Sequence, residues 1–474
     1  MLLERIYDED LAQASYFIGC QAKGEAVVVD ARRDIAPYQE LAAANGMKIV
    51  AVTETHIHAD FASGARELAI RTGAKLYLSD EGDQDWKYAF AADSGATLLH
   101  DGDTIVVGKI ALEVLHTPGH TPEHISFVLT DRANTDTPMG IFSGDFVFVG
   151  DVGRPDLLET AAGYKGTMEI GARQLFESIQ RFKNMPDYLQ VWPGHGAGSA
   201  CGKALGAVPQ STVGYEKLFN WAMNVKTEDE FVKTVTSDQP EPPVYFKEMK
   251  RINKEGVALL SDAAQPVQLA ASVLEQKLAS GMKVVDTRSV DAFARGHIAG
   301  TIDIPLGKQF INWAGWLLPY DAPFALIVDE ANLARTMLDL QLIGLDEIDG
   351  YWTPDVLEAW EPGLDTVQQV SPDAVNRDRV MVLDVRGSSE YRDGHVPGAL
   401  HIPLGYLEDR IDEVPQDKPL VVHCASGFRS MIASSILQAN GRTSVLNLIG
   451  GFDAWAAESK PVERGSKERE TVTS

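Results

Sequence analysis

Side chains able to bind a metal ion gather in one short stretch, Thr55-His-Ile-His-Ala-Asp-Phe61. This stretch follows the apolar run Lys48–Thr53, which predicts a buried strand. Three similar runs occur downstream and each closes its own apolar stretch: Pro118-Gly-His120, Ser143-Gly-Asp145 and Pro193-Gly-His195. Because strand ends are where α/β folds place their chemistry, the four runs predict one convergent site of imidazoles and carboxylates.

The order His-x-His-x-Asp, Gly-His, Gly-Asp, Gly-His resembles the metallo-β-lactamase superfamily over about the first 200 residues. The resemblance implies two mixed β-sheets packed face to face, with helices outside and a metal at one edge of the sandwich. Relatives that bind two metal ions carry a histidine directly after the aspartate of the first run. Here that residue is Phe61, whose ring cannot coordinate, so we expect a single ion.

By family position, the resemblance assigns the metal to His56, His120 and Asp145. Two imidazoles and one carboxylate leave three octahedral positions open, which is the arrangement of non-haem Fe(II) oxygenases. We therefore expect one Fe(II) per metal domain, with zinc only in a mis-loaded protein or under the hydrolase alternative below. Three further residues keep the family's types and would orient the ligands and bound water: His58, Asp60 and His195.

Other residues near these runs carry weaker signals. Arg154 matches an arginine that faces the thiol carrier in relatives, so the resemblance implies a substrate-binding role, and a surface salt bridge is the alternative. His116 and His124 are interpreted as ordinary loop residues. Cys20 and Cys201 are interpreted as small buried core residues, although Cys201 follows the last metal-binding run closely enough to lie near the metal.

The bulk properties limit the class of protein. A length of 474 residues predicts about three domains, and an apolar content of 45% indicates packed globular cores. The net charge of −26 disfavours nucleic acid and anionic membranes as partners. The N-terminus lacks the apolar segment of a secretory signal, no apolar run reaches membrane-spanning length, and three cysteines make no disulfide framework. These features predict a cytoplasmic protein.

The second half of the chain contains an internal repeat. Three segments recur 98 residues later: Val284–Arg288, His297–Gly300 and Ile304–Leu306 return as Val382–Arg386, His395–Gly398 and Ile402–Leu404. This repeat resembles the rhodanese fold, a parallel sheet flanked by helices. The expected fold class is therefore α/β and α+β multidomain, a metallo-β-lactamase αββα sandwich followed by two rhodanese-like α/β domains.

The domain boundaries follow from these patterns. We expect a metal domain over 1–204, a helical extension and linker over 205–262, a first rhodanese-like domain over 263–362 and a second over 363–474. Within the extension, the polar-faced periodicity predicts three helices: Tyr215–Lys226, Thr227–Thr236 and Tyr245–Asn253.

In the second rhodanese-like copy, an apolar strand ends at Cys424 and is followed by a tight loop and a helix over Ser430–Asn440. Backbone N–H groups of such a loop and the positive end of the helix favour a thiolate. A thiolate of this kind attacks sulfane sulfur and becomes a persulfide. We therefore expect Cys424 to be catalytic and Arg429 to hold an anionic donor such as thiosulfate, or else only to anchor the loop.

The first copy lacks this cysteine. Aligning Ala325–Asp329 with Leu420–Cys424 places Asp329 at the cysteine position. Because a carboxylate cannot carry sulfane sulfur, we predict that this copy is catalytically silent and serves as a spacer, a docking surface or part of an oligomer interface.

A single mononuclear metal site joined to two rhodanese-like copies resembles the persulfide dioxygenases fused to rhodanese. The resemblance implies oxidation of a low-molecular-weight thiol persulfide by O₂ to sulfite and thiol, coupled at Cys424 to thiosulfate formation or persulfide delivery. Two alternatives stay open: a glyoxalase-II-like zinc thioester hydrolase with a rhodanese tail, and a sulfur-relay or sensor protein with a vestigial metal site. The acidic surface and the silent copy also make a homo-oligomer the expected state.

Overall fold

The computed structural model describes residues 1–464 apart from 161–165, 204, 238, 240 and 261–264. The chain divides into two compact units, which we call the N-terminal and the C-terminal unit. The N-terminal unit comprises Met1–Ala264 and Leu338–Asp346, and the C-terminal unit comprises Gln265–Met337 and Glu347–Ser474. The segment Leu338–Asp346 therefore packs with the N-terminal unit, although the sequence repeat places it in the first rhodanese-like copy.

Two six-stranded sheets form the framework of the N-terminal unit. In the first sheet the strands follow chain order, the first three antiparallel and the rest parallel. They are β1 (Leu2–Asp8), β2 (Gln13–Cys20), β3 (Glu25–Val29), β4 (Lys48–Thr53), β5 (Lys75–Ser79) and β6 (Thr97–Leu99). The second sheet has the order β12-β11-β10-β9-β8-β7, in which β10 and β11 run parallel and the other pairs antiparallel. Its strands are β7 (Thr104–Val107), β8 (Ile110–His116), β9 (Ile125–Asp131), β10 (Gly140–Gly144), β11 (Gln190–Pro193) and β12 (Ser211–Thr212).

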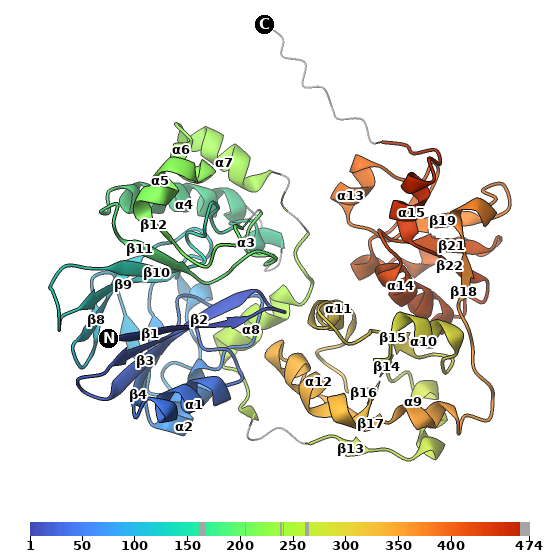
Figure 1. Ribbon diagram of the computed structural model, residues 1–474, viewed down its shortest axis with the longest axis horizontal. Coiled ribbons are helices and arrows are strands. Elements are labelled where there is room, and N and C mark those ends of the chain that lie inside the picture. The colour runs from blue at the N-terminus through green and yellow to red at the C-terminus, as the bar shows by residue number, and fades with distance from the viewer. Residues whose placement is uncertain (161–165, 204, 238, 240, 261–264, 465–474) are drawn as a thin grey trace, which may run out of the picture. The chain divides into compact units, whose positions relative to one another are not determined.

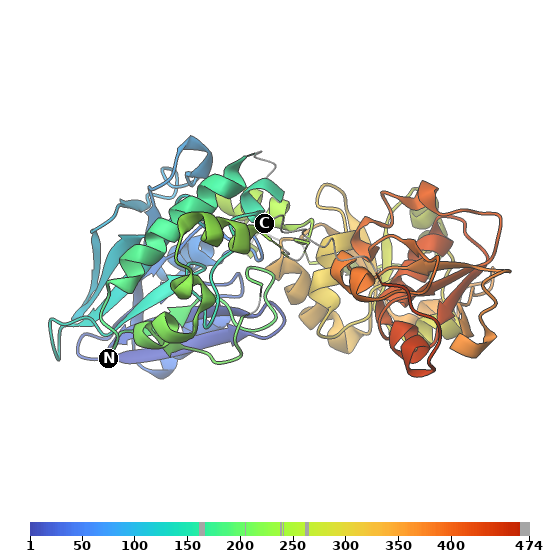
Figure 2. The same cartoon turned by 90° about the horizontal axis from the view of Figure 1, so that it is seen from above.

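The sheets pack face to face around a shared apolar core that includes Tyr16 and Phe127. Helices α1 (Ala36–Ala44) and α2 (Ala65–Thr72) cover the outer face of the first sheet, and both faces of β2 are buried as a result. The long helix α4 (Thr167–Lys183) covers the outer face of the second sheet (Figures 1 and 2). The expected αββα sandwich is confirmed.

The helices after β11 pack against the core of the N-terminal unit. Helices α5 (Val213–Phe219), α6 (Trp221–Asn224) and α7 (Glu228–Thr236) pack on the same apolar cluster as α4. The single helix expected over Tyr215–Lys226 is wrong, because the chain is extended at Asn220. The side chain of Asn220 accepts the backbone N–H of Ala222 and starts a new helix.

The C-terminal unit contains two five-stranded parallel sheets of identical order, β13-β17-β16-β14-β15 and β18-β22-β21-β19-β20. The first copy contains β13 (Val267–Gln268), β14 (Val284–Asp286), α10 (Val290–Arg295), β15 (Ile302–Asp303), β16 (Phe324–Ile327), α12 (Glu330–Leu342) and β17 (Ile348–Trp352). The second contains β18 (Gln368–Val370), β19 (Met381–Asp384), α13 (Ser388–Asp393), β20 (Leu400–His401), β21 (Leu420–His423), α14 (Phe428–Ala439), β22 (Val445–Leu448) and α15 (Gly451–Ala457). The sequence repeat is thus a repeat of structure. Among the described residues, no helix is both long and apolar enough to cross a bilayer.

Candidate metal centre and sulfur-transfer loop

The predicted metal-binding runs meet where their strands end. His56 follows β4, His120 follows β8, and Asp145 comes directly after β10. The three side chains are at most 1% exposed, and one donor atom of each lies within 4.8 Å of the others. Oδ2 of Asp145 is 3.5 Å from Nε2 of His120 and 3.9 Å from Nε2 of His56. The proposed ligand set therefore forms one buried group of the size of a metal site.

The donor atoms of this group fit a divalent metal ion. Nε2 of His56 and both carboxylate oxygens of Asp145 are buried and have no hydrogen-bond partner among the described residues. Burial of unpaired polar atoms costs free energy, which a bound cation would offset. Burial lowers the pKa of His120 to about 3, so this imidazole is neutral at pH 7. Its Nδ1 donates to the carbonyl of Arg154 at 3.1 Å, which leaves Nε2 as the ligand atom.

Asp30 braces the loop that carries the histidines of the first run. It follows β3 in a left-handed backbone conformation with φ of 55°. Its carboxylate accepts the backbone N–H of Thr55 at 2.6 Å and the Thr55 hydroxyl at 2.9 Å, and it lies 3.2 Å from Nε2 of His58. Burial acts to lower the pKa of His58, but the charge and hydrogen bond of Asp30 raise it to about 9. Asp30 thus holds the His58 ring beside the proposed ligands.

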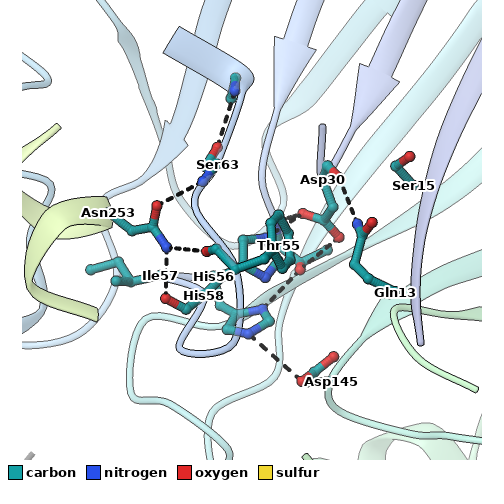
Figure 3. A network of polar contacts seen from close by, with 12 residues as sticks. Gln13, Ser15, Asp30, Thr55, His56, Ile57, His58, Ser63, Asp145 and Asn253 are labelled. Carbon is teal, nitrogen blue, oxygen red and sulfur yellow. Dashed lines mark hydrogen bonds and ion pairs between the residues drawn. The ribbon is translucent and has the colours of Figure 1, made fainter. Parts of the chain in front are cut away.

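Asn253 holds the other side of the same loop, and it comes from α8 (Phe246–Glu255), far along the chain. Its Nδ2 donates to the carbonyls of His58 at 2.8 Å and Phe61 at 2.7 Å, and its Oδ1 accepts the N–H of Ser63 at 2.8 Å. Figure 3 shows the loop between Asn253 on one side and Asp30 on the other. Neither residue was identified from the sequence, in which nothing connects α8 to this loop.

His124 is part of the centre, and its interpretation as an ordinary loop residue is wrong. Its Nε2 accepts the backbone N–H of Asp145 at 3.1 Å, so the proton is on Nδ1, which donates to the Thr117 hydroxyl at 2.8 Å. Its ring also stacks on that of His56, with centroids 5.0 Å apart. His116, by contrast, is partly exposed and contacts the Pro122 carbonyl. The spacing Pro-Gly-His-x-x-x-His was the one available signal for His124.

A second group of donors lies against the first. Asp60, His195 and Cys201 are buried and lie within 4.8 Å of one another. Nε2 of His195 is 3.1 Å from Oδ2 of Asp60 and 3.4 Å from Oδ1 of Asp145. Cys201 is therefore buried, as the sequence indicated, but it also faces the metal centre. Phe61 has no donor atom. Its ring packs on the ring of His58, with the centroids 4.4 Å apart.

Arg154 is 1% exposed, so the alternative of a surface salt bridge is wrong. Its guanidinium binds Asp156 through Nε at 2.8 Å and Nη2 at 2.5 Å, and Nη1 donates to the carbonyl of Ala200 at 3.1 Å. Its backbone N–H also donates to the carbonyl of Cys201. Arg154 thus contacts the loop of Cys201, and its own carbonyl orients His120. A role toward the thiol carrier stays a prediction.

Cys424 follows β21 and is 1% exposed. Its Sγ accepts the backbone N–H of Gly427 at 3.1 Å and lies 3.5 Å from the Ser430 hydroxyl. Helix α14 starts directly after this loop, so its positive end faces the sulfur. Gly451 has a positive φ of 57°, and a Cβ there would lie 2.5 Å from the carbonyl oxygen of Cys424. Glycine at position 451, the first residue of α15, is therefore required for the loop to pack.

Arg429 does not extend freely over the loop. Its Nη1 is 2.6 Å from Oε2 of Glu390, and its Nη2 is 2.8 Å from Oε1. This bidentate pair crosses from α14 to α13. Burial acts to lower the pKa of Arg429, but the Glu390 pair outweighs this effect and raises it.

The alignment of the silent copy needs a correction of one residue. In both copies the strand before the loop pairs with the strand of the Asp-x-Arg motif, and this pairing makes Ala325 equivalent to Val421. Cys424 therefore corresponds to Val328 and not to Asp329. Helix α12 starts two residues after the equivalent position, whereas α14 starts four residues after Cys424. The first copy thus lacks both the thiol and the loop that would surround it.

Comparisons with known proteins match both halves of this arrangement. The profile of the Metallo-beta-lactamase superfamily matches residues 8–195, and that of the Rhodanese-like domain matches residues 369–458. Persulfide dioxygenase ETHE1 of Bos taurus is 26% identical over 244 residues, which is 50% of this chain and 80% of that protein. A sulfurtransferase of Allochromatium vinosum is 35% identical over 95 residues, which is 20% of this chain and 89% of that protein. The crystal structure of a metallo-beta-lactamase from Staphylococcus aureus is 46% identical with a TM-score of 0.67, covering 75% of this chain and 99% of that one.

Proposed function

The chain belongs to the metallo-beta-lactamase superfamily and carries a rhodanese-like domain over residues 369–458, and we propose on this premise that it oxidises a thiol persulfide and transfers sulfane sulfur through Cys424. In the proposed oxidation, R–S–SH, O₂ and water give R–SH, sulfite and two protons. The terminal sulfur is oxidised and O₂ is reduced. One observation carries the proposal: a buried His-His-Asp group with unpaired donor atoms and a cysteine loop occur in one chain.

In this proposal His56, His120 and Asp145 would hold one Fe(II), which would supply a site for oxidation of a persulfide sulfur by O₂. The surrounding residues fix the three ligands before substrate arrives. Asp30 sets the loop of His56, and the N–H of Asp145 is held by His124. Because these groups are buried, they lose little freedom on binding and exclude bulk water from the centre.

The proposed transfer at Cys424 balances without a further oxidant. The Cys424 thiolate attacks the terminal sulfur of R–S–SH, the S–S bond breaks, and R–S⁻ leaves with Cys424 as the persulfide. Sulfite then attacks the terminal sulfur of this persulfide, which gives thiosulfate and returns the thiolate. The Gly427 N–H is placed to stabilise the thiolate in both steps.

Oxygen uptake tests the first reaction. Protein loaded with Fe(II) is expected to consume O₂ when glutathione persulfide is added, with one sulfite or thiosulfate formed per O₂. Metal-free and zinc-loaded protein are expected to consume none. Equal O₂ uptake by the zinc-loaded protein would show that iron is not needed.

A Cys424→Ser variant tests the order of the two reactions. If sulfite from the metal centre is the acceptor at Cys424, the variant accumulates sulfite in place of thiosulfate at an unchanged O₂ uptake. If Cys424 instead delivers persulfide to the metal centre, O₂ uptake itself falls. Both products are measured by chromatography after thiol labelling.

A zinc thioester hydrolase is the second candidate, and the group of Asp60, His195 and Cys201 favours it. His195 of this group lies 3.4 Å from Oδ1 of Asp145, while Oδ2 lies nearer His56 and His120, so a second ion would be held by Asp60, His195 and Cys201. Metal analysis of protein purified without added metal separates the two candidates. One iron per chain supports the oxidation, and two zinc ions per chain with hydrolysis of S-lactoylglutathione support the hydrolase.

A further inference from the structure

The electrostatics around Cys424 distinguish between classes of sulfur donor. Within the loop from Cys424 to Ser430, Arg429 is the one cationic residue. Its guanidinium is already bound at two points by Glu390, at 2.6 and 2.8 Å. Arg386 is bound in the same way by Asp384, through Nε at 3.0 Å and Nη2 at 2.6 Å. The arginine of the loop and the arginine of the Asp-x-Arg motif are thus each paired with a carboxylate.

We propose that Glu390 is the residue that sets the donor specificity of Cys424, by opposing the dianion thiosulfate relative to thiol persulfides. This inference rests on the proposed sulfur transfer at Cys424. A thiosulfate ion carries two negative charges to the sulfur that is attacked, whereas a thiol persulfide brings at most one to that position. With its arginine paired, the loop offers thiosulfate backbone N–H groups, the Ser430 hydroxyl and the end of α14, but no arginine free of a carboxylate.

The geometry shows that Glu390 is fixed and not a mobile surface acid. Besides Arg429, its Oε2 accepts the backbone N–H of Gly387 at 3.1 Å, which caps the start of α13. The Glu390 side chain is 37% exposed and that of Arg429 is 23% exposed, so solvent screens the pair only in part. The carboxylate is therefore held beside Arg429, where its charge opposes an approaching anion.

The repeat provides an independent observation. Position 390 corresponds to position 292 in the first copy, 98 residues earlier, and that residue is Ala292. The neighbouring Asp-x-Arg pair is present in both copies, as Asp286 with Arg288 and as Asp384 with Arg386. The carboxylate at position 390 thus occurs in the copy that carries the cysteine and not in the other copy. The Asp-x-Arg pair occurs in both copies.

The test compares two donors on the complete protein under anaerobic conditions, where the oxidation cannot consume persulfide. Thiosulfate and 2-hydroxyethyl persulfide are each mixed with the protein, and persulfidation of Cys424 is followed by quenched alkylation and mass spectrometry. In Glu390→Gln the amide still accepts the Gly387 N–H, but the negative charge is lost. We expect the ratio of the rate constants, thiosulfate over hydroxyethyl persulfide, to rise about tenfold at low ionic strength and less in salt.

Matched variants separate this effect from other causes. Glu413→Gln removes an exposed acid paired with Arg410 in the same unit and is expected to leave the ratio unchanged. Arg429→Gln added to Glu390→Gln is expected to abolish the gain. An unchanged ratio in Glu390→Gln, or equal acceleration with both donors, would overturn the inference while sulfur transfer itself stands. Failure of both donors to label Cys424 in the unaltered protein would overturn the proposed transfer and this inference with it.

Discussion

Single hydrogen bonds decide which nitrogen of each buried imidazole is available at the metal centre. Nδ1 of His120 donates to the Arg154 carbonyl, and this leaves Nε2 facing Asp145. His124 does the reverse, since its Nε2 accepts the Asp145 N–H and its proton is on Nδ1. Identical side chains therefore have different roles, as a proposed ligand and as a support for the ligand loop.

A His124→Phe substitution tests this support. The phenyl ring fills a similar volume but leaves the Asp145 N–H buried without an acceptor, so we expect metal affinity to fall by about 10- to 100-fold. Competition with a chromogenic chelator measures the affinity. His116→Phe, at the partly exposed last residue of β8, is the matched control and is expected to bind metal normally. Equal affinity in the two variants would contradict the assignment.

Asp303 leads to a prediction on stability and pH. It is fully buried, its carboxylate oxygens have no hydrogen-bond partner among the described residues, and burial together with the Asp286 charge raises its pKa well above the ordinary value. The folded state thus holds the proton more tightly than the unfolded state, so stability falls as pH rises above about 4 toward the folded pKa.

We therefore expect Asp303→Asn to stabilise the C-terminal unit at pH 7, by about 1–3 kcal/mol, and to have little effect near pH 4. Differential scanning calorimetry between pH 4 and 8 measures this. Asp321→Asn, at an exposed turn, serves as the control. A gain that is the same at all pH values would show that the ionised form of Asp303 is not the cause.

Among the elements, α8 contributes most to the metal centre from outside the predicted metal domain. It lies beyond residue 204, yet Asn253 on this helix makes three hydrogen bonds to the loop of residues 58–63. A helix is a rigid support for such a contact, since its backbone bonds are satisfied internally. The loop conformation therefore depends on an element outside the sandwich.

An Asn253→Leu substitution keeps the volume of the side chain and removes all three bonds. We expect loss of bound iron and a fall in O₂ uptake of at least about tenfold, because each buried unpaired group costs about 1–3 kcal/mol. Asn253→Asp is expected to behave similarly, since the carbonyls of His58 and Phe61 need a donor. Asn45→Leu, which removes a local bond at an exposed helix end, is the control. Normal iron content in Asn253→Leu would contradict this role.

For the molecule as a whole, the compact units do not follow the order of the sequence. Leu338–Asp346 belongs to the N-terminal unit, in which Arg33 is 1% exposed. Its guanidinium binds Asp346 at 2.6 and 2.7 Å, and it donates to the carbonyls of Gln341 and Ala258. The first rhodanese-like copy thus supplies part of the N-terminal unit. A homo-oligomer stays a prediction.

A double-mutant cycle of Arg33→Met and Asp346→Ala tests this membership. Each substitution is expected to lower the free energy of opening of the N-terminal unit by about 1–3 kcal/mol, and the double variant should lose little more, because both remove the same pair. Hydrogen exchange of the amides in β3 and β4 reports this free energy. Arg173→Met, in an exposed pair with Glu169, is the control. Additive losses would show that the two residues do not stabilise each other.

The sequence by itself determined the strand ends, the runs of possible donors that follow them and the internal repeat with Cys424 in its second copy, while the resemblance to a family narrowed the donors to His56, His120 and Asp145. These features are local, since an apolar run followed by a chemically distinct residue can be read within a few positions. Even there, the register of the silent copy was displaced by one residue, because strand pairing and not spacing decides which residue is equivalent to Cys424.

Only the tertiary structure decided what holds these residues in place. Asn253 reaches the first metal-binding loop from about 190 positions away, Glu390 pairs with Arg429 across two helices, and Asp346 returns to the N-terminal unit. No periodicity or motif connects such residues, because a hydrogen bond between distant segments depends on how the elements pack. The candidate donor residues could therefore be named from short stretches, and the contacts that position them required the folded chain.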